Sequence, residues 1–368
     1  MKVFALIQSL KPGGGNRVML ELLQRLQLNS TEIEAMVICS NKAEHINTYG
    51  FDNKSIQIID DVQKSSSLSR LINNFKALSY LRHNYKKGDI IIYSDPIISL
   101  LCSFLCKDNM FRFIQADDYR IYDSNALFKN KILLVFYKIC TFISYQKKIS
   151  YIFNSTFTME CFNKLRLFKN YQFTIINPFI NPLIFCETIF DKKYEDETVI
   201  CTFARNNKAK GFSDFLKAIN IIQNKGIKIK NVIVSQDNLK DFNLELIENY
   251  EIIRPANDFE ISKILNYSDI FISTSKREGF GLPAIEAMSC GCAVITSDNR
   301  GCMEYAKNQV NCLLYEYGNS EMLALKIENL IYDTGLLSAI KHESSRTIKR
   351  YFIDSQSKKF NKFLFKDA

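Results

Sequence analysis

The residues best suited to chemistry lie in the second half of the chain, between positions 275 and 288. The stretch EGFGLPAIEAM begins at Glu278 and places Glu286 eight residues later. Glycines followed by a proline are typical of a loop that exposes backbone N–H groups at the start of a helix, and such a loop can bind an anion. The two carboxylates could accept hydrogen bonds from hydroxyls of the same ligand. The alternative is an ordinary helix start with surface glutamates.

A second group of charged residues lies upstream. The run TFAR ends at Arg205, and Lys210 with Gly211 precedes the next helical stretch. An arginine and a lysine beside the start of a helix can hold a diphosphate. In isolation such a pair is more often a solvated loop, but its place before the Glu278 loop favours the diphosphate site.

Short apolar runs that alternate with amphipathic stretches must position these residues. Uninterrupted Val/Ile runs between turn residues are typical of parallel strands buried on both faces, and their alternation with helices predicts a doubly wound α/β fold. We expect strands at 3–8, 35–39, 56–59, 89–93, 111–115, 149–154, 173–177, 199–203, 232–234, 252–253, 270–273 and 293–296.

The chain length of 368 residues favours two domains. Pro178 and Pro182 interrupt the strand–helix pattern, and a charged stretch follows at 191–197. We therefore expect one domain over 1–180 and a second over 181–350.

The net charge of +9 is confined to the first half. Residues 1–185 hold 23 Lys+Arg and 14 Asp+Glu, whereas the remainder holds 25 of each. A basic half indicates an anionic partner such as a phosphorylated substrate or an anionic membrane surface. Nucleic acid is the weakest option, because no zinc finger or RNA-recognition motif is present. The alternative is a compositional bias with no partner.

An apolar stretch at 132–145 raises the question of a membrane segment. It has 14 residues and contains Lys138, whereas a transmembrane helix needs about 20 apolar residues. A core helix is the expected structure. A helix on a membrane surface is the alternative, because basic residues flank the stretch, namely Lys129, Lys131, Lys147 and Lys148.

Cysteine and histidine usage indicates no structural metal site. The eleven cysteines are scattered, mostly within apolar segments as at Cys39, Cys102, Cys140 and Cys201, and none has zinc-ligand spacing with the three histidines. We expect buried thiols in a reduced, cytoplasmic protein. No D-x-D occurs, so a divalent-metal diphosphate site of that type is not predicted either.

The motif at Glu278 resembles the E-x7-E signature of retaining glycosyltransferase family 4, also called glycosyltransferase group 1, which has the GT-B fold. Arg205 with Lys210 and Gly211 matches the family's G-R…K-G pair. The segment 291–301 resembles its G-x-P-V-I-x-S…G continuation, although Cys292-Ala293 stands where x-Pro is frequent. The resemblance implies two Rossmann-like doubly wound domains facing across a cleft, with a C-terminal helix at about 351–368 packing back on the first domain.

The resemblance also implies roles for single residues. Glu286 would bind the nucleotide ribose hydroxyls, and Glu278 would contact the donor sugar. Arg205 and Lys210 would stabilise the leaving diphosphate. Further donor contacts are expected from the glycine-rich loop at 11–17, from the amides after Glu278 and from the backbone near the base. These residues are Gly14, Gly15, Gly279, Phe280, Gly281, Leu282 and Arg254.

The acceptor side departs from the pattern of many relatives, because none of the three histidines falls there. The stretch FIQADDY at 113–119 is similar to a Q-D-Y-E variant found in rhamnosyltransferase-like members. Two interpretations of Asp117 and Asp118 stay open. Either carboxylate contacts the acceptor hydroxyl, or both cap the next helix.

The resemblance implies a retaining, metal-independent enzyme that needs no cofactor. It would move a hexosyl or deoxyhexosyl group from a nucleotide-sugar donor to a surface glycan or lipid-linked acceptor, as in lipopolysaccharide, O-antigen or capsule biosynthesis. We expect a cytoplasmic protein with a peripheral contact to the inner face of the plasma membrane. One alternative is a non-catalytic nucleotide-sugar-binding subunit of a glycan assembly complex. Another is a nucleotide-sugar 2-epimerase, for which the extra acid/base groups cannot be placed.

Overall fold

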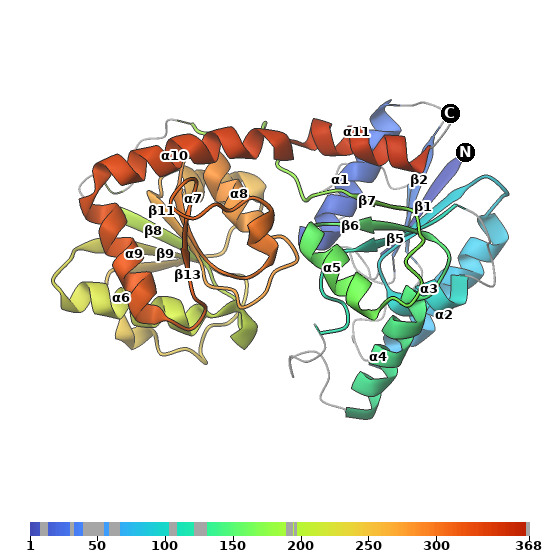
Figure 1. The fold of residues 1–368 in the computed structure, drawn as a ribbon, viewed down its shortest axis with the longest axis horizontal. Coiled ribbons are helices and arrows are strands. Elements are labelled where there is room, and N and C mark those ends of the chain that lie inside the picture. Colours follow the sequence, from blue (N-terminus) through green and yellow to red (C-terminus); the bar gives the residue numbers. More distant parts are fainter. Residues whose placement is uncertain are drawn as a thin grey trace. The chain divides into compact units, whose positions relative to one another are not determined.

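The computed structural model of the chain describes residues 1–7, 14–29, 33–39, 55–58, 67–102, 109–120, 131–188, 194 and 197–365. The chain forms two compact units. Unit 1 comprises Met1–Pro178 and Asp354–Ala368, and unit 2 comprises Phe179–Ile353 (Figure 1). The chain thus leaves unit 1 after Pro178 and returns to it at Asp354, where the sequence placed boundaries at 180 and 350.

Unit 1 is built on a seven-stranded sheet in the order β3-β2-β1-β4-β5-β6-β7, with every pair parallel. Its central strands are short β-branched and aromatic runs that are buried on both faces, as in β4, where all four residues are buried. The strands are β1 Lys2–Ile7, β2 Glu34–Cys39, β3 Ile56–Ile58, β4 Ile90–Tyr93, β5 Met110–Ile114, β6 Ser150–Phe153 and β7 Phe173–Ile175.

Helices cover both faces of this sheet. Figure 1 shows α1 and α11 above it and α2 to α4 below it. The helices of unit 1 are α1 Gly14–Asn29, α2 Ser67–Asn84, α3 Pro96–Cys102, α4 Lys131–Tyr145, α5 Thr156–Leu165 and α11 Ile353–Leu364, whose first residue belongs to unit 2.

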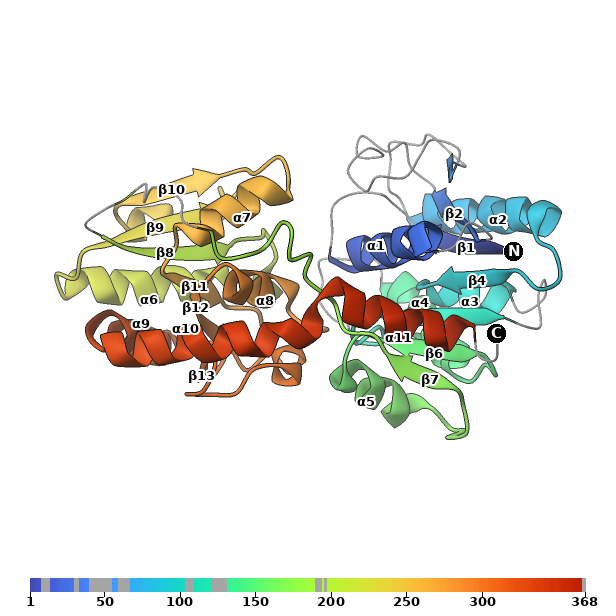
Figure 2. The ribbon, with the colours of Figure 1, turned by 90° about the horizontal axis from the view of Figure 1, so that it is seen from above.

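Unit 2 repeats the doubly wound pattern with six parallel strands. Their order is β10-β9-β8-β11-β12-β13, and Figure 2 shows these strands one after another from one edge of the sheet to the other. The strands are β8 Thr198–Phe203, β9 Ile229–Val234, β10 Tyr250–Ile253, β11 Ile270–Ser273, β12 Ala293–Ser297 and β13 Leu313–Tyr315. The predicted doubly wound fold is confirmed in both units, and β13 is a strand that the sequence analysis missed.

The helices of unit 2 include five α-helices and four short 3-10 turns in the described part. The α-helices are α6 Phe212–Asn224, α7 Asp258–Asn266, α8 Leu282–Ser289, α9 Ser320–Tyr332 and α10 Thr334–Ile348. The 3-10 turns are η3 Lys208–Lys210, η4 Leu244–Leu246, η5 Gly301–Glu304 and η6 Lys349–Tyr351. Two apolar clusters of buried residues pack on the sheet, for example Ile285 and Met288 of α8 in one and Phe215 and Ile219 of α6 in the other.

The apolar stretch at 132–145 is helix α4, but it is only in part a core helix. One face is buried through Tyr137, Cys140 and Tyr145. Other large apolar side chains of the same helix are exposed, including Ile132 at 81%. The expectation of a core helix is therefore confirmed for one face of α4 and wrong for the opposite face. No helix in the described ranges is long and apolar enough to cross a membrane.

The cysteines mostly match the expected buried thiols. Of the nine cysteines among the described side chains, all are free and only Cys186 is exposed. Cys102, Cys140 and Cys201 are buried as expected, and the side chain of Cys39 lies outside the described ones.

Candidate functional site

Lys210 lies in a tight turn at the carboxyl end of β8. The turn η3 begins after Asn207, whose side chain accepts a hydrogen bond from the N–H of Ala209 at 2.9 Å. The N–H of Lys210 donates to the carbonyl of Asn207 at 2.8 Å. This local capping fixes the backbone of Lys210 without using its ammonium group.

The turn is also fastened to the neighbouring strand. The hydroxyl of Thr274, just after β11, donates to the carbonyl of Lys210 at 2.8 Å, and the N–H of Lys276 donates to the carbonyl of Ala209 at 2.8 Å. Gly211 follows with φ +65°, and a Cβ there would lie 2.0 Å from the carbonyl oxygen of Thr274. Glycine is thus required both for the left-handed backbone and for the close approach of the two loops.

Glu278 lies in the loop after β11, which packs on the segment that follows β12. Its N–H donates to the carbonyl of Asn299 at 3.2 Å. Gly301 touches the same loop so closely that a Cβ would lie 2.4 Å from the carbonyl oxygen of Glu278. Arg300, between Asn299 and Gly301, has φ +68°. The N–H of Gly301 donates to the carbonyl of Asn299 at 2.8 Å, which closes a three-residue turn.

These two loops bring Lys210 and Glu278 together. Nζ of Lys210 lies 2.5 Å from Oε1 of Glu278, although the residues are 68 positions apart. The side chains keep 35% and 21% of their surface exposed. Because β8 and β11 are adjacent and parallel, their carboxyl ends meet at one edge of the sheet, where doubly wound folds bind ligands. A half-exposed ammonium group there can contact a phosphate or a sugar oxygen.

Helix α8 starts directly after the Glu278 loop. Gly281 has φ +97°, and its carbonyl accepts a hydrogen bond from the hydroxyl of Tyr305 at 3.1 Å. The side chains of Phe280 and Leu282 are buried, and the Phe280 ring packs on Tyr305 and Tyr351. Phe280 and Leu282 can therefore present only backbone groups to a ligand, which is the role predicted for the amides of Gly279 to Leu282.

Glu286 lies in the second turn of α8 and is only 3% exposed. A carboxylate is rarely buried to this extent unless its oxygens have partners. Glu286 thus differs from Glu278, whose side chain is more exposed and pairs with Lys210.

Two predicted donor-site arginines lie at the same edge of the sheet, but neither contacts the Lys210 pair. Arg205 follows β8, and its guanidinium lies 3.6 Å from a carboxylate oxygen of Asp237, which follows β9. The other oxygen of Asp237 accepts from the N–H of Asn206 at 2.8 Å. Arg254 follows the edge strand β10 and is exposed.

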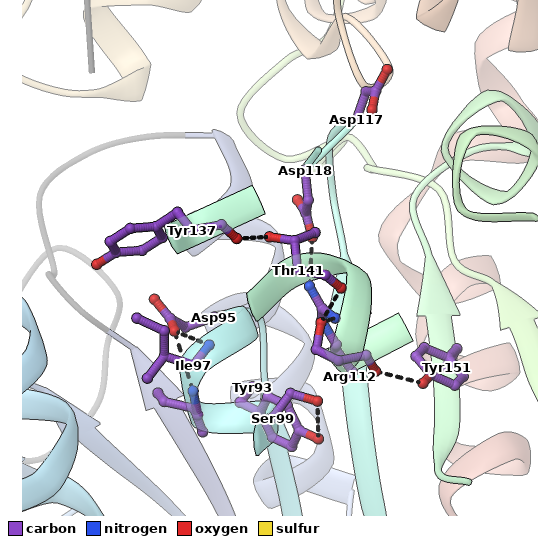
Figure 3. Close-up of polar contacts among 12 residues, drawn as sticks. Tyr93, Asp95, Ile97, Ser99, Arg112, Asp117, Asp118, Tyr137, Thr141 and Tyr151 are labelled. Carbon is purple, nitrogen blue, oxygen red and sulfur yellow. Dashed lines mark hydrogen bonds and ion pairs between the residues drawn. The ribbon is translucent and has the colours of Figure 1, made fainter. Parts of the chain in front are cut away.

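In unit 1, the predicted acceptor-side carboxylates take two different positions. Figure 3 shows Asp118 turned toward Arg112 of β5, whereas Asp117 points away from it. The distance from Arg112 to the Asp118 carboxylate is 2.9 Å. The backbone N–H of Arg120 donates to Asp117 at 3.3 Å, so Asp117 caps a turn at 118–120. Neither carboxylate caps a helix among the described residues.

Arg112 is the largest fully buried side chain of the described structure, with 0% exposure. Its guanidinium donates to the hydroxyl of Ser144 and lies 4.9 Å from the ring centre of Tyr145, both on α4. Burial lowers the pKa of Arg112, but the charge of Asp118 and nearby tyrosines more than offset this and raise it. The side chain therefore stays charged and ties β5 to α4.

Burial also acts on the partner carboxylate. It raises the pKa of Asp118 to about 6, against the opposing effect of the positive charge and hydrogen bond of Arg112. Asp95 contributes to the same increase, and its own side chain caps α3 by accepting from the N–H groups of Ile97 and Ile98 at 2.7 and 3.2 Å (Figure 3).

The sequence predicted that Gly14 and Gly15 lie in a loop. They form instead the first turn of α1. The first residues of the predicted glycine loop, 11–13, lie outside the described residues. A Cβ on Gly15 would lie 2.8 Å from the side-chain oxygen of Gln115, at the carboxyl end of β5. The glycine thus allows α1 to approach the loop that carries Asp117.

Several contributors to these sites escaped the sequence analysis. Arg112 lies within an apolar strand and Tyr305 in a stretch without a motif, so nothing marked them as partners of Asp118 and Gly281. Gly301 had a signal, because it falls on the last glycine of the family's pattern. Among the described residues, no cluster of three or more His, Cys, Asp or Glu side chains is arranged to hold a metal ion.

The fold is similar to that of several solved structures. Anabaena HepE in complex with UDP-glucose superposes with a TM-score of 0.79 at 18% identity, with 99% of each chain covered. Two parallel Rossmann-like units with this connectivity define the GT-B fold of glycosyltransferases.

Residues 187–347, which lie within unit 2, match the family model of glycosyl transferases group 1. The capsular polysaccharide biosynthesis glycosyltransferase CapM of Staphylococcus aureus is 26% identical over 171 residues, 45% of each chain. A Campylobacter jejuni protein, N-acetylgalactosamine-N,N'-diacetylbacillosaminyl-diphospho-undecaprenol 4-alpha-N-acetylgalactosaminyltransferase, is 25% identical over 374 residues, 95% of each chain. In the first of these matches the chain spans about half the length of the relative.

Proposed function

We propose that the protein is a glycosyltransferase that moves a hexosyl or deoxyhexosyl group from a nucleotide-sugar to a growing surface glycan. The observation that carries the proposal is the pairing of Lys210 and Glu278 at the carboxyl ends of two adjacent strands, directly before the helix that bears Glu286. This edge offers a cation, a carboxylate and the start of a helix to one ligand. Those are the groups that a sugar diphosphate needs.

In the proposed reaction, the bond between the anomeric carbon and the donor phosphate breaks while a bond to the acceptor hydroxyl oxygen forms. The acceptor hydroxyl attacks from the face on which the phosphate leaves and passes its proton to that phosphate. The configuration is therefore retained without a nucleophile of the enzyme. Lys210 and Arg205 stabilise the negative charge that develops on the nucleoside diphosphate. Glu278 orients Lys210 in the free protein and accepts hydrogen bonds from sugar hydroxyls in the complex. Glu286 binds the ribose.

The same proposal covers the acceptor and the absence of a cofactor. The acceptor is a glycan or a lipid-linked glycan, in line with the diphospho-undecaprenol in the name of the Campylobacter jejuni relative. The diphosphate is neutralised by Arg205 and Lys210, so turnover needs no divalent metal. Asp117, which caps the turn at 118–120, is the better of the two acceptor-side carboxylates, because Asp118 is engaged by the buried Arg112.

The test is donor turnover by the full chain after a thermal-shift screen of UDP-, GDP-, dTDP- and ADP-sugars, since a bound ligand stabilises the folded state. Lys210→Ala, Arg205→Ala and Glu286→Ala should each lower turnover, with Lys210→Ala losing about 10²–10³-fold, as for the removal of one donor to a developing negative charge. Addition of a chelator should leave the rate unchanged.

The matched control is Lys225→Ala. Lys225 forms an ion pair with Glu328 at the same distance of 2.5 Å. It follows the C-terminal end of α6, however, whereas Lys210 precedes the N-terminal end of that helix. This variant should retain full turnover. If Lys210→Ala is as active as Lys225→Ala, the assignment of the site is wrong. Tight nucleotide-sugar binding without transfer or hydrolysis would instead identify a non-catalytic binding subunit.

A further inference from the structure

Helix α4 of unit 1 has an apolar face that does not pack on the unit. The residues of this face recur at intervals of one, three and four, so they lie along one side of the helix, opposite the buried Tyr137, Thr141 and Ser144. The exposed side chains are Ile132 at 81%, Val135 at 55%, Phe136 at 43%, Ile139 at 53% and Ile143 at 45%. Figure 1 shows α4 projecting at the edge of unit 1. We call these five residues the α4 stripe.

Two more exposed apolar residues lie beside the end of α4. The side chain of Gln146 accepts a hydrogen bond from the N–H of Leu167 at 2.9 Å and donates to the carbonyl of Leu165 at 3.2 Å. The turn after α5 is therefore fixed to the last turn of α4. Leu167 and Phe168 in that turn are 67% and 65% exposed. Contiguous exposed apolar surface of this kind marks a binding surface.

The segment of sequence around the same helix carries most of the net positive charge of the chain. Residues 124–185 contain eight Lys and Arg but one acidic residue, Glu160, a difference of +7 out of the total of +9. Helix α4 itself carries Lys131 and Lys138 and no acidic residue. Lys147 and Lys148 follow its end. A surface that covers the α4 stripe therefore lies beside the lysines of α4 and of the turn after it, and beside no acidic residue of α4.

We propose that the α4 stripe docks the protein on an anionic lipid bilayer. The helix lies in the plane of the membrane with the stripe at the boundary between headgroups and acyl chains, and the lysines contact lipid phosphates. With 15 residues, α4 is about 22 Å long and too short to span the hydrocarbon core. An apolar face bordered by lysines without any acidic residue matches a fluid anionic surface, because lipid phosphates can adjust to every lysine. A folded protein partner would need fixed carboxylates in matching positions.

The inference is independent of the proposed sugar transfer, because it rests on the surface of unit 1 alone. It assigns the excess charge of the first half to a specific helix. It also predicts that stable binding to the membrane needs both the α4 stripe and the lysines, since either element alone gives weak, reversible binding.

The chain has no tryptophan, and this permits a direct test. In the full-length Phe136→Trp variant, fluorescence should shift to the blue when vesicles of phosphatidylcholine and phosphatidylglycerol are added, and brominated lipids should quench it. The control Tyr332→Trp places the single tryptophan at an exposed position on α9 of unit 2, where Tyr332 is 68% exposed. Its spectrum should not change. Equal responses of the two variants, or no response of either, would refute the docking surface.

Co-sedimentation with the same vesicles provides the second arm. The wild type should bind at low salt, and binding should weaken at high salt and on pure phosphatidylcholine. Phe136→Ser with Ile139→Ser should weaken binding roughly tenfold or more, as should Lys147→Glu with Lys148→Glu. Met322→Ser with Leu325→Ser, exposed apolar positions on α9, should bind as the wild type does. Self-association of the wild type that the stripe substitutions abolish, without vesicle binding, would show instead that a second copy covers the stripe.

Discussion

Both units contain an ion pair near the carboxyl edge of a parallel sheet, but the two pairs differ in access to solvent. In unit 1, Arg112 is 0% exposed and its partner Asp118 is 18% exposed. In unit 2, the corresponding values for Lys210 and Glu278 are 35% and 21%. The first cation is fixed by Ser144 and Tyr145, whereas the second pairs with Glu278 and is held mainly through its backbone.

The difference shows that the same topology can hold a cation that stabilises the fold or a cation that is accessible to a ligand. A buried arginine with several partners connects elements of the fold, because its removal leaves an unpaired carboxylate in a poorly solvated place. A half-exposed lysine on a rigid turn contributes little to stability and remains able to exchange its partner for a ligand. The charged residues suited to binding are therefore those whose backbone is fixed but whose ionic group is accessible.

The largest expected effect is on unit 1. Arg112→Met should lower the free energy of opening of β5 and β6 by about 3–5 kcal/mol, as for the loss of one partner of a buried pair. Lys210→Met should change the stability of β8 and β11 by less than about 1 kcal/mol. Hydrogen exchange read by mass spectrometry measures the two units separately. Equal effects of the two substitutions would show that the pairs do not differ in kind.

An intermediate effect is expected at the loop that supports Glu278. In Gly301→Ala, the new Cβ meets the carbonyl oxygen of Glu278 at 2.4 Å and the nitrogen of Phe280 at 2.7 Å, so the loop must move. We expect a loss of about 1–3 kcal/mol in stability, typical of overpacking, together with reduced donor turnover. Thermal unfolding and initial rates measure the two effects.

The matched control for this change is Gly335→Ala on α10. There the closest atom to a new Cβ is a side-chain oxygen of Asp333 at 3.3 Å, and no backbone atom is close. Its turnover should equal that of the wild type. Wild-type turnover in Gly301→Ala as well would mean that the position of the Glu278 loop does not matter for the reaction.

A further effect concerns pH. The pKa of Asp118 is raised from 3.8 to about 6 in the folded chain, so the folded state binds this proton more tightly than the unfolded state does. Its contribution to stability is complete below pH 3.8 and is lost as the pH rises through about 6. The wild type should therefore gain stability relative to Asp118→Asn as the pH falls from 7 to 4, measured by urea unfolding. A difference that does not depend on pH would contradict the raised pKa.

Most of the strands and the donor motif could be predicted from the sequence, because each depends on residues close together in the chain. Apolar runs such as 89–93 were sufficient to locate β4, and the spacing of Glu278 and Glu286 located the loop before α8. The pairing of Glu278 with Lys210 could not be predicted, since it depends on how two loops 68 residues apart pack on each other.

Two further features could not be predicted for a different reason. The run at 111–115 was apolar enough to predict a strand, so the arginine within it carried no sign of a partner on α4. The composition of an apolar helix likewise does not indicate which of its faces packs on the rest of the unit. Exposure of the α4 stripe is a property of the packed unit, and the sequence alone favoured a core helix there.

The discontinuity of unit 1 has a consequence for how the protein is made. Asn177 is synthesised early, but its backbone N–H bonds to the side chain of Gln356, and Phe111 packs on Phe363 of α11. A ribosome adding about 5–20 residues per second needs roughly 10–35 s to make residues 179–353 before those partners emerge. Unit 2 is then a complete folding unit while unit 1 still lacks its last helix. The nascent chain therefore finishes its second half first, and the half that is translated first is completed last.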